Sequence, residues 1–190
     1  MYHIKNDKRA RQSAELLYTG LMKCLERKPY DQITISDIQK ETGIARSTFY
    51  RCFDNLSDIL YWKCDAGFQK ALAGFDAGTE PVGIFSEMLL IKHYFAYWIK
   101  NSDILSLLIK INRQDIIYAC HMKNAESLRA RFGELPGMDR VQGRYFMALR
   151  TGITISILSA WLQGGKKETA EDIMQILQTQ FLYLGQKPHG

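Results

Sequence analysis

The side chains best suited to bind another molecule lie close together in residues 45–51, which read ARSTFYR. The guanidinium of Arg46 can donate two hydrogen bonds to O6 and N7 of a guanine, and the hydroxyls of Ser47 and Thr48 can bond to bases or phosphates. The hydroxyl of Tyr50 can hold a phosphate. These residue types predict a surface that binds duplex DNA.

Two short helices joined by a glycine turn are expected to position this surface. Residues 34–37 (TISD) have the form of a capping box, in which the Thr hydroxyl bonds the amide of Asp37 and the Asp carboxylate reaches back. A helix to about residue 41 would end at the turn 42–44, where Gly43 can take a positive φ at little steric cost. The next helix, about 45–53, would carry the DNA-binding side chains.

A helix, a three-residue turn containing glycine and a second helix form the helix-turn-helix motif, whose second helix enters the major groove of DNA. Ile38, Ile44 and Phe49 would form the small apolar core that fixes the angle between the two helices. Short helix pairs with a glycine turn also occur in plain helical bundles. The physical pattern alone therefore leaves a structural role open.

Residues 8–60 resemble the DNA-binding domain of the TetR family over their whole length. The most specific stretch is 33–60, ITISDIQKETGIARSTFYRCFDNLSDIL. It is similar to the family pattern of a Thr-capped helix, a Gly turn, a [ST]-[FL]-Y-x-x-F recognition helix and an acidic helix start ending in Leu. The resemblance implies a one-component transcription regulator with a helix-turn-helix domain, 1–54, and a helical effector-binding and dimerisation domain, 55–190.

The resemblance also implies which residues contact DNA. The start of the second helix would meet phosphates, residues 46–48 would face base edges, and Tyr50 would anchor a phosphate. The basic residues that lead into the first helix would approach the backbone or the minor groove. The predicted DNA-binding residues are Lys8, Arg9, Arg11, Thr34, Ser36, Ala45, Arg46, Ser47, Thr48, Tyr50 and Arg51.

Two positions depart from the family pattern. The family usually has a lysine in place of Leu56, where it reaches a phosphate, and a neutral or basic residue in place of Asp54. The carboxylate of Asp54 would oppose DNA if it pointed that way, although Arg51 could compensate. These departures keep open a co-regulator of the same fold that binds DNA weakly and acts through a protein partner.

The charge distribution agrees with a polyanion partner for the N-terminal part. Residues 1–53 hold ten Lys or Arg and six Asp or Glu, so they carry +4 of the chain's net charge of +5. A basic segment on a near-neutral remainder favours nucleic acid binding. A solvated charged face would have the same composition, so charge alone leaves both interpretations open.

Other classes of function find little support in the sequence. We find no Gly-rich phosphate loop, no Ser or Cys elbow, no HExxH motif and no paired carboxylates, so we expect no enzyme, no metal site and no cofactor. The four cysteines lie far apart, as reduced thiols of a cytosolic protein do. No leader segment is expected, and apolar runs such as 153–162 are too short to span a bilayer. We therefore expect a cytoplasmic protein with no membrane partner.

Hydrophobic periodicity near 3.6 residues predicts an all-α fold of about nine helices. Three of the four prolines fall between the expected helices, and Pro188 follows the last one. Gly164-Gly165 marks the end of the penultimate helix, and Thr169 caps the last helix. The layout of these two helices resembles a subgroup of TetR-like C-terminal domains that includes regulators linked to dihydroxyacetone kinase. The expected helices are 5–27, 34–41, 45–53, 55–75, 82–100, 102–110, 113–132, 138–163 and 168–185.

The last two helices are predicted to form a homodimer. The helix 138–163 has a row of small side chains beside a row of large ones, and the final helix has an apolar stripe of its own. Such faces suit a four-helix, two-fold interface, although they could also form an intrachain core. The predicted interface residues are Ala148, Gly152, Ser156, Ala160, Ile173, Ile176, Leu177 and Phe181.

The middle helices are rich in aromatic residues with two histidines among them. One interpretation is a pocket for a small apolar or aromatic effector, and the other is that most of these residues belong to the core. The candidate pocket residues are Phe85, His93, Tyr94, Tyr97, Trp98, Tyr118 and His121. The sequence as a whole predicts a repressor that reads a palindromic operator as a homodimer and is released by an effector.

Overall fold

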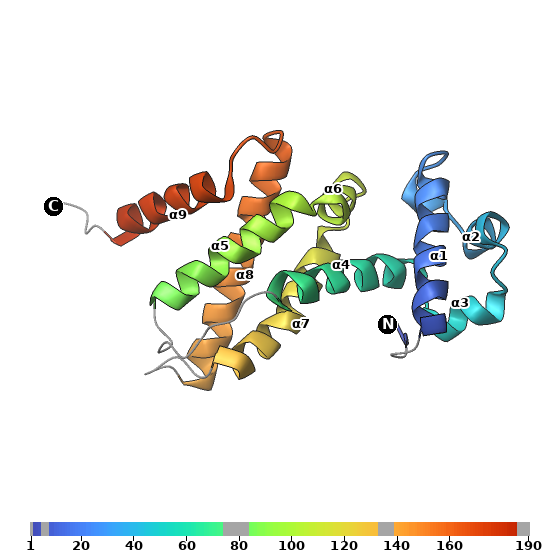
Figure 1. Ribbon diagram of the computed structural model, residues 1–190, viewed down its shortest axis with the longest axis horizontal. Coiled ribbons are helices and arrows are strands. Elements are labelled where there is room, and N and C mark those ends of the chain that lie inside the picture. The colour runs from blue at the N-terminus through green and yellow to red at the C-terminus, as the bar shows by residue number, and fades with distance from the viewer. Residues whose placement is uncertain (1, 5–7, 74–83, 133–138, 186–190) are drawn as a thin grey trace. The chain divides into compact units, whose positions relative to one another are not determined.

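The computed structural model describes residues 2–4, 8–73, 84–132 and 139–185 (Figure 1). Over these residues it contains nine α-helices and one 3-10 turn, which confirms the predicted all-α fold of about nine helices. The helices are α1 (Lys8–Leu25), α2 (Ile35–Thr42), α3 (Arg46–Cys52), α4 (Leu56–Ala73), α5 (Ile84–Lys100), α6 (Asp103–Lys110), α7 (Gln114–Phe132), α8 (Arg140–Gln163) and α9 (Ala170–Gly185).

The chain forms two compact units. The first consists of Met1–Gly67 and Ile104–Cys120, and the second of Phe68–Asp103 and His121–Gly190. The first unit therefore also includes α6 and the start of α7, while the division at residues 54 and 55 stays a prediction. Arg113 donates to Ser57, and the thiol of Cys120 lies 3.7 Å from the carbonyl oxygen of Tyr61.

Close packing of α1 on α2 forms the core of the N-terminal part of the first unit. The buried positions of α1 recur every three or four residues, as expected for an amphipathic helix: Ala14, Leu17, Gly20, Leu21 and Cys24. A Cβ atom on Gly20 would collide with the Cγ2 methyl of Thr42 and would lie 3.2 Å from Cγ2 of Ile38. The absence of a side chain at Gly20 therefore allows the close approach of α1 and α2, a role that the sequence pattern does not reveal.

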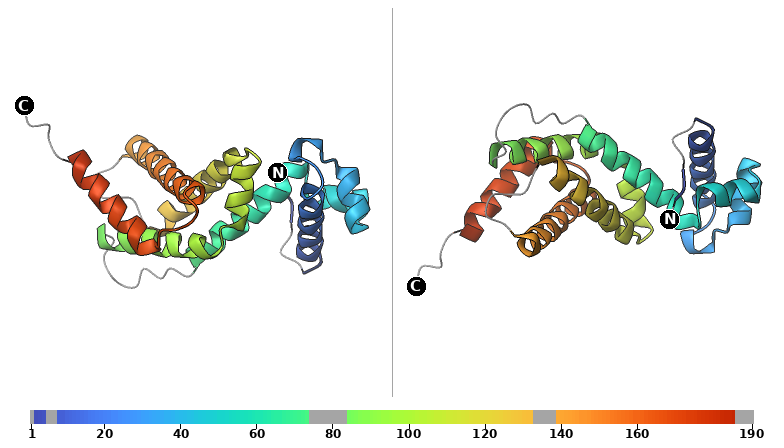
Figure 2. Two further views of the ribbon diagram at one scale, coloured as in Figure 1. Left: turned by 90° about the horizontal axis from the view of Figure 1, so that it is seen from above. Right: turned by 90° about the horizontal axis from the view of Figure 1, so that it is seen from below.

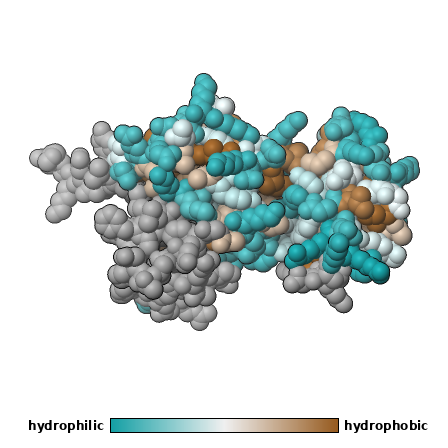
Figure 3. All heavy atoms as spheres, viewed as in Figure 1, coloured by the Kyte–Doolittle hydropathy of each residue, from teal (hydrophilic) through white to brown (hydrophobic). Residues whose placement is uncertain are grey.

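Aromatic side chains fill the core of the second unit. Phe68, Tyr94, Trp98 and His121 contact one another, and the ring centroids of Phe68 and His121 lie 4.0 Å apart. Helix α9 packs against α5, where Lys92 and Glu171 form an ion pair of 2.8 Å (Figure 2). The surface in the view of Figure 3 is mostly hydrophilic, with hydrophobic residues in separate patches.

The predicted caps at Thr34 and Thr169 and the predicted turn at Gly43 are confirmed in the structure, whereas α1 ends at Leu25, two residues before its predicted end. The Thr34–Asp37 capping box is present, and Gly43 closes α2 in the left-handed conformation with φ of 70°. Thr169 and Asp172 cap α9 in the same manner as Thr34 and Asp37 cap α2. A second capping box, Asp139 with Gln142, begins α8 and was not predicted.

Helix α8 is unusual in being long and apolar yet largely uncovered. Within the described part of the chain, Val141–Gln163 is the one stretch long and apolar enough to cross a membrane by length and composition. Only 19% of that window is buried. Its exposed apolar residues Val141, Tyr145 and Leu149 are four residues apart and therefore share one face.

Candidate nucleic-acid interface

The helix pair α2–α3 has the geometry of a helix-turn-helix. The amide of Gly43 donates to the carbonyl of Gln39 at 2.8 Å, and the amide of Ile44 donates to the hydroxyl of Thr42 at 3.2 Å. These bonds hold the turn, while Ile38 and Phe49 are fully buried beneath it. Ile44 is half-buried, and both α2 and α3 pack against α1, while a direct contact of Ile38 with Phe49 stays a prediction.

Helix α3 turns its polar side chains outward. Arg46, Ser47, Tyr50 and Arg51 are exposed, and Thr48 is half-buried. Arg46 donates from Nη2 to the Tyr50 hydroxyl at 3.3 Å, and its guanidinium lies 5.6 Å from the centre of that ring. Each guanidinium has five N–H donors, more than these contacts use. The structure thus brings the predicted base-reading and phosphate-binding residues onto one surface, next to the exposed Ala45 that caps α3.

The two residues at the start of α2 that are predicted to contact phosphates differ in their hydrogen bonding. Ser36 is exposed in the first turn, whereas the Thr34 hydroxyl donates to Oδ2 of Asp37 at 2.6 Å. The same carboxylate oxygen accepts a bond from Lys28 at 2.5 Å. The pKa of Asp37 is held well below its usual value by Lys28 first and then by Thr34. The Thr34 hydroxyl therefore serves the helix cap in this structure.

The other positions that the sequence singles out lie outside α2 and α3. Lys8, Arg9 and Arg11 are exposed in the first turn of α1. Oδ1 of Asp54 lies 2.8 Å from Nε2 of His3. Leu56 is half-buried at the start of α4.

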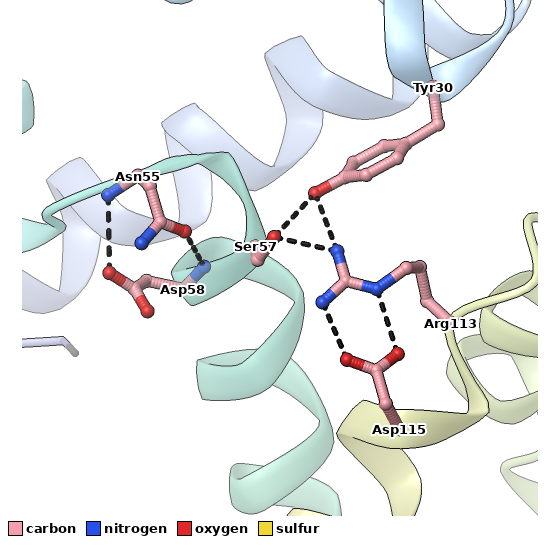
Figure 4. Close-up of polar contacts among 6 residues, drawn as sticks. All are labelled: Tyr30, Asn55, Ser57, Asp58, Arg113 and Asp115. Carbon is pink, nitrogen blue, oxygen red and sulfur yellow. Dashed lines mark hydrogen bonds and ion pairs between the residues drawn. The ribbon is translucent and has the colours of Figure 1, made fainter.

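A polar cluster that the sequence did not predict lies beside the helix-turn-helix (Figure 4). Arg113 donates from Nε and Nη2 to the two carboxylate oxygens of Asp115, both at 2.8 Å. Its Nη1 donates to Oγ of Ser57 at 2.7 Å and to the Tyr30 hydroxyl at 3.4 Å. Nearby, Asp58 and Asn55 exchange hydrogen bonds at the start of α4. Residues from three separate segments meet here, so no local pattern could have revealed the cluster.

The candidate effector residues are only partly brought together. Tyr94, Trp98 and His121 are buried around Phe68, and the Tyr94 hydroxyl lies 2.6 Å from Nε2 of His121. His93 and Tyr97 are half-buried, and burial raises the pKa of Tyr97. Tyr118 belongs to the first unit and is 47% exposed, because its position on α7 faces solvent. The side chain of Phe85 lies outside the described residues.

The candidate dimer residues divide between the protomer's surface and its core. Ser156 and Ala160 are exposed, Ala148 and Gly152 are half-buried, and Ile176 is exposed on α9. Ile173 and Leu177 are buried, so their side chains lie in the core of the second unit, and their place in a dimer interface stays a prediction. The side chain of Phe181 lies outside the described residues. The apolar stripe Val141, Tyr145 and Leu149 extends the exposed surface of α8 beyond the predicted set.

The helix-turn-helix and the bundle of helices together define a helical fold of the transcription-regulator type. The chain is 30% identical over 70 residues to the HTH-type dhaKLM operon transcriptional activator DhaS of Lactococcus lactis subsp. lactis (strain IL1403). That match covers 37% of this chain and 36% of the relative, so the chain spans about a third of the relative's length.

The crystal structure of Lin0861 from Listeria innocua is similar over nearly the whole fold. Its TM-score is 0.76 at 15% sequence identity, with 96% of this chain and 98% of Lin0861 covered. At this identity the likeness concerns the fold alone. No family model matches the chain.

Proposed function

We propose that this protein is a DNA-binding transcription regulator whose helix α3 reads the major groove. The observation that carries the proposal is the surface of α3, where Arg46, Ser47, Tyr50 and Arg51 are exposed above the buried ring of Phe49. An exposed set of guanidinium and hydroxyl donors on the second helix of a helix-turn-helix suits recognition of base edges and phosphates. The similarity to an HTH-type transcriptional activator supports the same class. Membership of the TetR family stays a prediction.

The proposed regulator acts as a homodimer through α8. Tyr145 and Leu149 are 66% and 65% exposed, and the small residues Ser156 and Ala160 continue the uncovered surface toward the end of the helix. Pairing of this surface with a second copy would remove apolar area from water. A two-fold dimer would read a palindrome with half-sites roughly 34–36 Å apart or a multiple of that. We place the protein in the cytoplasm, with α8 covered by protein and not by lipid.

The buried aromatic cluster of the second unit supports a small apolar or aromatic effector. Nε1 of Trp98 is buried and has no hydrogen-bond partner within the described residues. An effector with an acceptor atom beside Trp98 would satisfy this donor, and one that prefers the non-binding conformation would release DNA. We propose repression as the output. The Lactococcus lactis relative is a transcriptional activator, so a reporter assay with and without the gene for this protein decides the direction.

A second candidate function is a co-regulator that binds DNA weakly and acts through a protein partner. Two observations favour it: Asp54 adds a carboxylate just after α3, and Leu56 begins α4 without a cation. A catalytic role is not proposed, because no residue in the sequence suggests one.

Selection of bound sequences from a random duplex pool tests the proposal. Purified protein at near-physiological salt is expected to enrich a palindrome, and the affinity for it should fall steeply with salt because counterions are released from phosphates. The Arg46→Ala, Tyr50→Phe double variant is the control and should enrich no palindrome. Weak binding without enrichment, together with a stable complex with another protein, would favour the co-regulator.

A further inference from the structure

The cluster of Tyr30, Ser57, Arg113 and Asp115, called here the Arg113 cluster, joins three segments of the first unit (Figure 4). Tyr30 begins the 3-10 turn between α1 and α2, and Ser57 lies in the first turn of α4. Arg113 lies in the turn between α6 and α7. One guanidinium therefore bonds to side chains that are 83 and 56 residues away in the sequence.

The bonding of this guanidinium uses both of its edges. Nε and Nη2 grip the Asp115 carboxylate in a bidentate pair, while Nη1 serves both hydroxyls. The Tyr30 hydroxyl and Oγ of Ser57 are themselves 3.0 Å apart, so the three groups form a closed triangle. Asp115 raises the pKa of Arg113, and Arg113 lowers that of Asp115. A planar fork is needed for this geometry, and an ammonium group cannot reproduce it.

The turn that carries Arg113 is itself held in place. Asn112 has a positive φ of 56°, and the amide of Arg113 donates to the carbonyl of Leu108 at 2.7 Å. The amide of Ile111 donates to the carbonyl of Leu107 at 3.0 Å. The backbone thus presents the guanidinium from a fixed position, which is what an anchoring group requires.

The two hydroxyls that Arg113 holds lie on either side of the helix-turn-helix in the sequence. Tyr30 is followed by the buried Ile33 and by Thr34, which caps α2. Ser57 follows Phe53, the residue that ends α3. The chain therefore enters the α2–α3 pair just after one Arg113 partner and leaves it just before the other.

We propose that Arg113 is a positioning residue for DNA binding, which fixes the two ends of the α2–α3 pair and so orients α3 without contacting DNA. This inference rests on the proposed function. The side chain of Arg113 is only 25% exposed, and its donors already have protein partners. Loss of the cluster leaves the α3 surface chemically intact but lets its orientation vary. Binding then costs additional ordering of the α2–α3 pair.

A double-mutant cycle tests this role through DNA affinity. Arg113→Lys should weaken binding to the selected duplex about tenfold. The Tyr30→Phe, Ser57→Ala double variant should weaken it by the same factor, because both changes remove the same hydrogen bonds. Adding Arg113→Lys to the Tyr30→Phe, Ser57→Ala protein should then change affinity less than about twofold. Lys110→Ala removes an exposed cation from the end of α6 and is the matched control, expected to leave affinity unchanged.

The salt dependence separates positioning from direct contact. Arg113→Ala, which removes the charge, and wild type should show the same slope of log affinity against log salt, since no phosphate contact is lost. A slope reduced by about one in an Arg113→Ala protein would show a phosphate contact and overturn the proposal. Wild-type affinity in Arg113→Lys, or fully additive effects in the cycle, would also overturn it.

Amide hydrogen exchange provides a measurement that needs no DNA. Arg113→Lys should speed exchange in peptides covering 30–36 and 53–58, with exchange in α1 unchanged and a thermal unfolding curve that is still cooperative. Unchanged exchange in both peptides would contradict the proposal. If wild-type protein selected no DNA while these peptides behaved as expected, the proposed function would fail but the anchoring of the α2–α3 pair by Arg113 would stand.

Discussion

Arg46 and Tyr50 lie one turn apart on the exposed face of α3, and Nη2 of Arg46 donates to the Tyr50 hydroxyl at 3.3 Å. The bond joins the cation that is predicted to contact a base to the hydroxyl that is predicted to hold a phosphate. The two side chains therefore form a pair on one surface, although their expected roles differ.

Substitution of each member separates these roles. Arg46→Ala should cost about 1–3 kcal/mol in binding and relax the preference at one base position, because a bidentate contact to a base is lost. Tyr50→Phe should weaken binding to all sequences similarly, since a phosphate contact carries no sequence information. Affinities of both variants for a panel of single-base changes in the selected site measure the difference. An unaltered preference profile in Arg46→Ala would remove that residue from base recognition.

Gly20→Ala should destabilise the first unit by about 1–3 kcal/mol, because the added methyl forces an overpacked contact between α1 and α2. Thr42 cannot rotate away easily, since its hydroxyl donates to the carbonyl of Ile38 at 2.8 Å and accepts from the amide of Ile44. Thr42→Ser removes the colliding methyl and keeps both bonds. Urea unfolding of Gly20→Ala in the Thr42→Ser background should therefore show most of the loss restored. Equal losses in the two backgrounds would mean that the collision is not the cause.

Asp37→Asn should destabilise the protein at neutral pH more than at acid pH. The folded-state pKa of Asp37 is lowered from 3.8, chiefly by Lys28 and then by Thr34, so the carboxylate contributes stability above about 3.8. That contribution decreases as the pH falls below 3.8 toward the folded-state pKa, where the wild type becomes protonated too. The melting temperatures of the two proteins should therefore differ by a nearly constant amount from pH 7 to about pH 5, and their convergence should begin near pH 4 and continue to about pH 2.

Lys28→Met is the companion variant, since it removes the largest cause of the lowered pKa and leaves the Thr34 cap intact. It should reproduce part of the loss at neutral pH and show the same convergence. A difference between wild type and Asp37→Asn that stayed constant with pH would show that the ion pair contributes nothing to stability.

Leu149→Asp should convert the protein to a monomer with little loss of protomer stability, because this side chain is 65% exposed in the protomer. A charge placed in the apolar centre of an interface must be desolvated without a partner. Sedimentation velocity at micromolar protein measures the result, and Lys167→Glu, a change of charge on an exposed residue past α8, is the control. A wild-type protein that sediments as a monomer at these concentrations would exclude the α8 dimer. Flotation of wild type with lipid vesicles would instead favour a membrane as the cover of α8.

Features that depend on neighbouring residues could be predicted from the sequence. The Thr34–Asp37 cap, the left-handed Gly43 and the order of nine helices each follow from residue types within one or two turns of each other. The same local logic would have found the Asp139–Gln142 capping box, which was overlooked. The reason is physical: caps and turns are decided by hydrogen bonds between residues at most four positions apart.

Only the tertiary structure shows which apolar residues are buried and which partners an isolated polar residue has. Periodicity marks Ile173 and Leu149 alike as apolar, but only packing shows that the first is buried in the protomer and the second faces outward. Arg113 has no local signal, because its partner Ser57 is 56 residues away and meets it only after folding. Gly20 was not detected for the same reason, since its small size matters only where α1 meets Thr42 of α2. Local hydrogen bonds determine where the helices begin and end. Contacts between distant segments determine which of their side chains are buried and which form the candidate site.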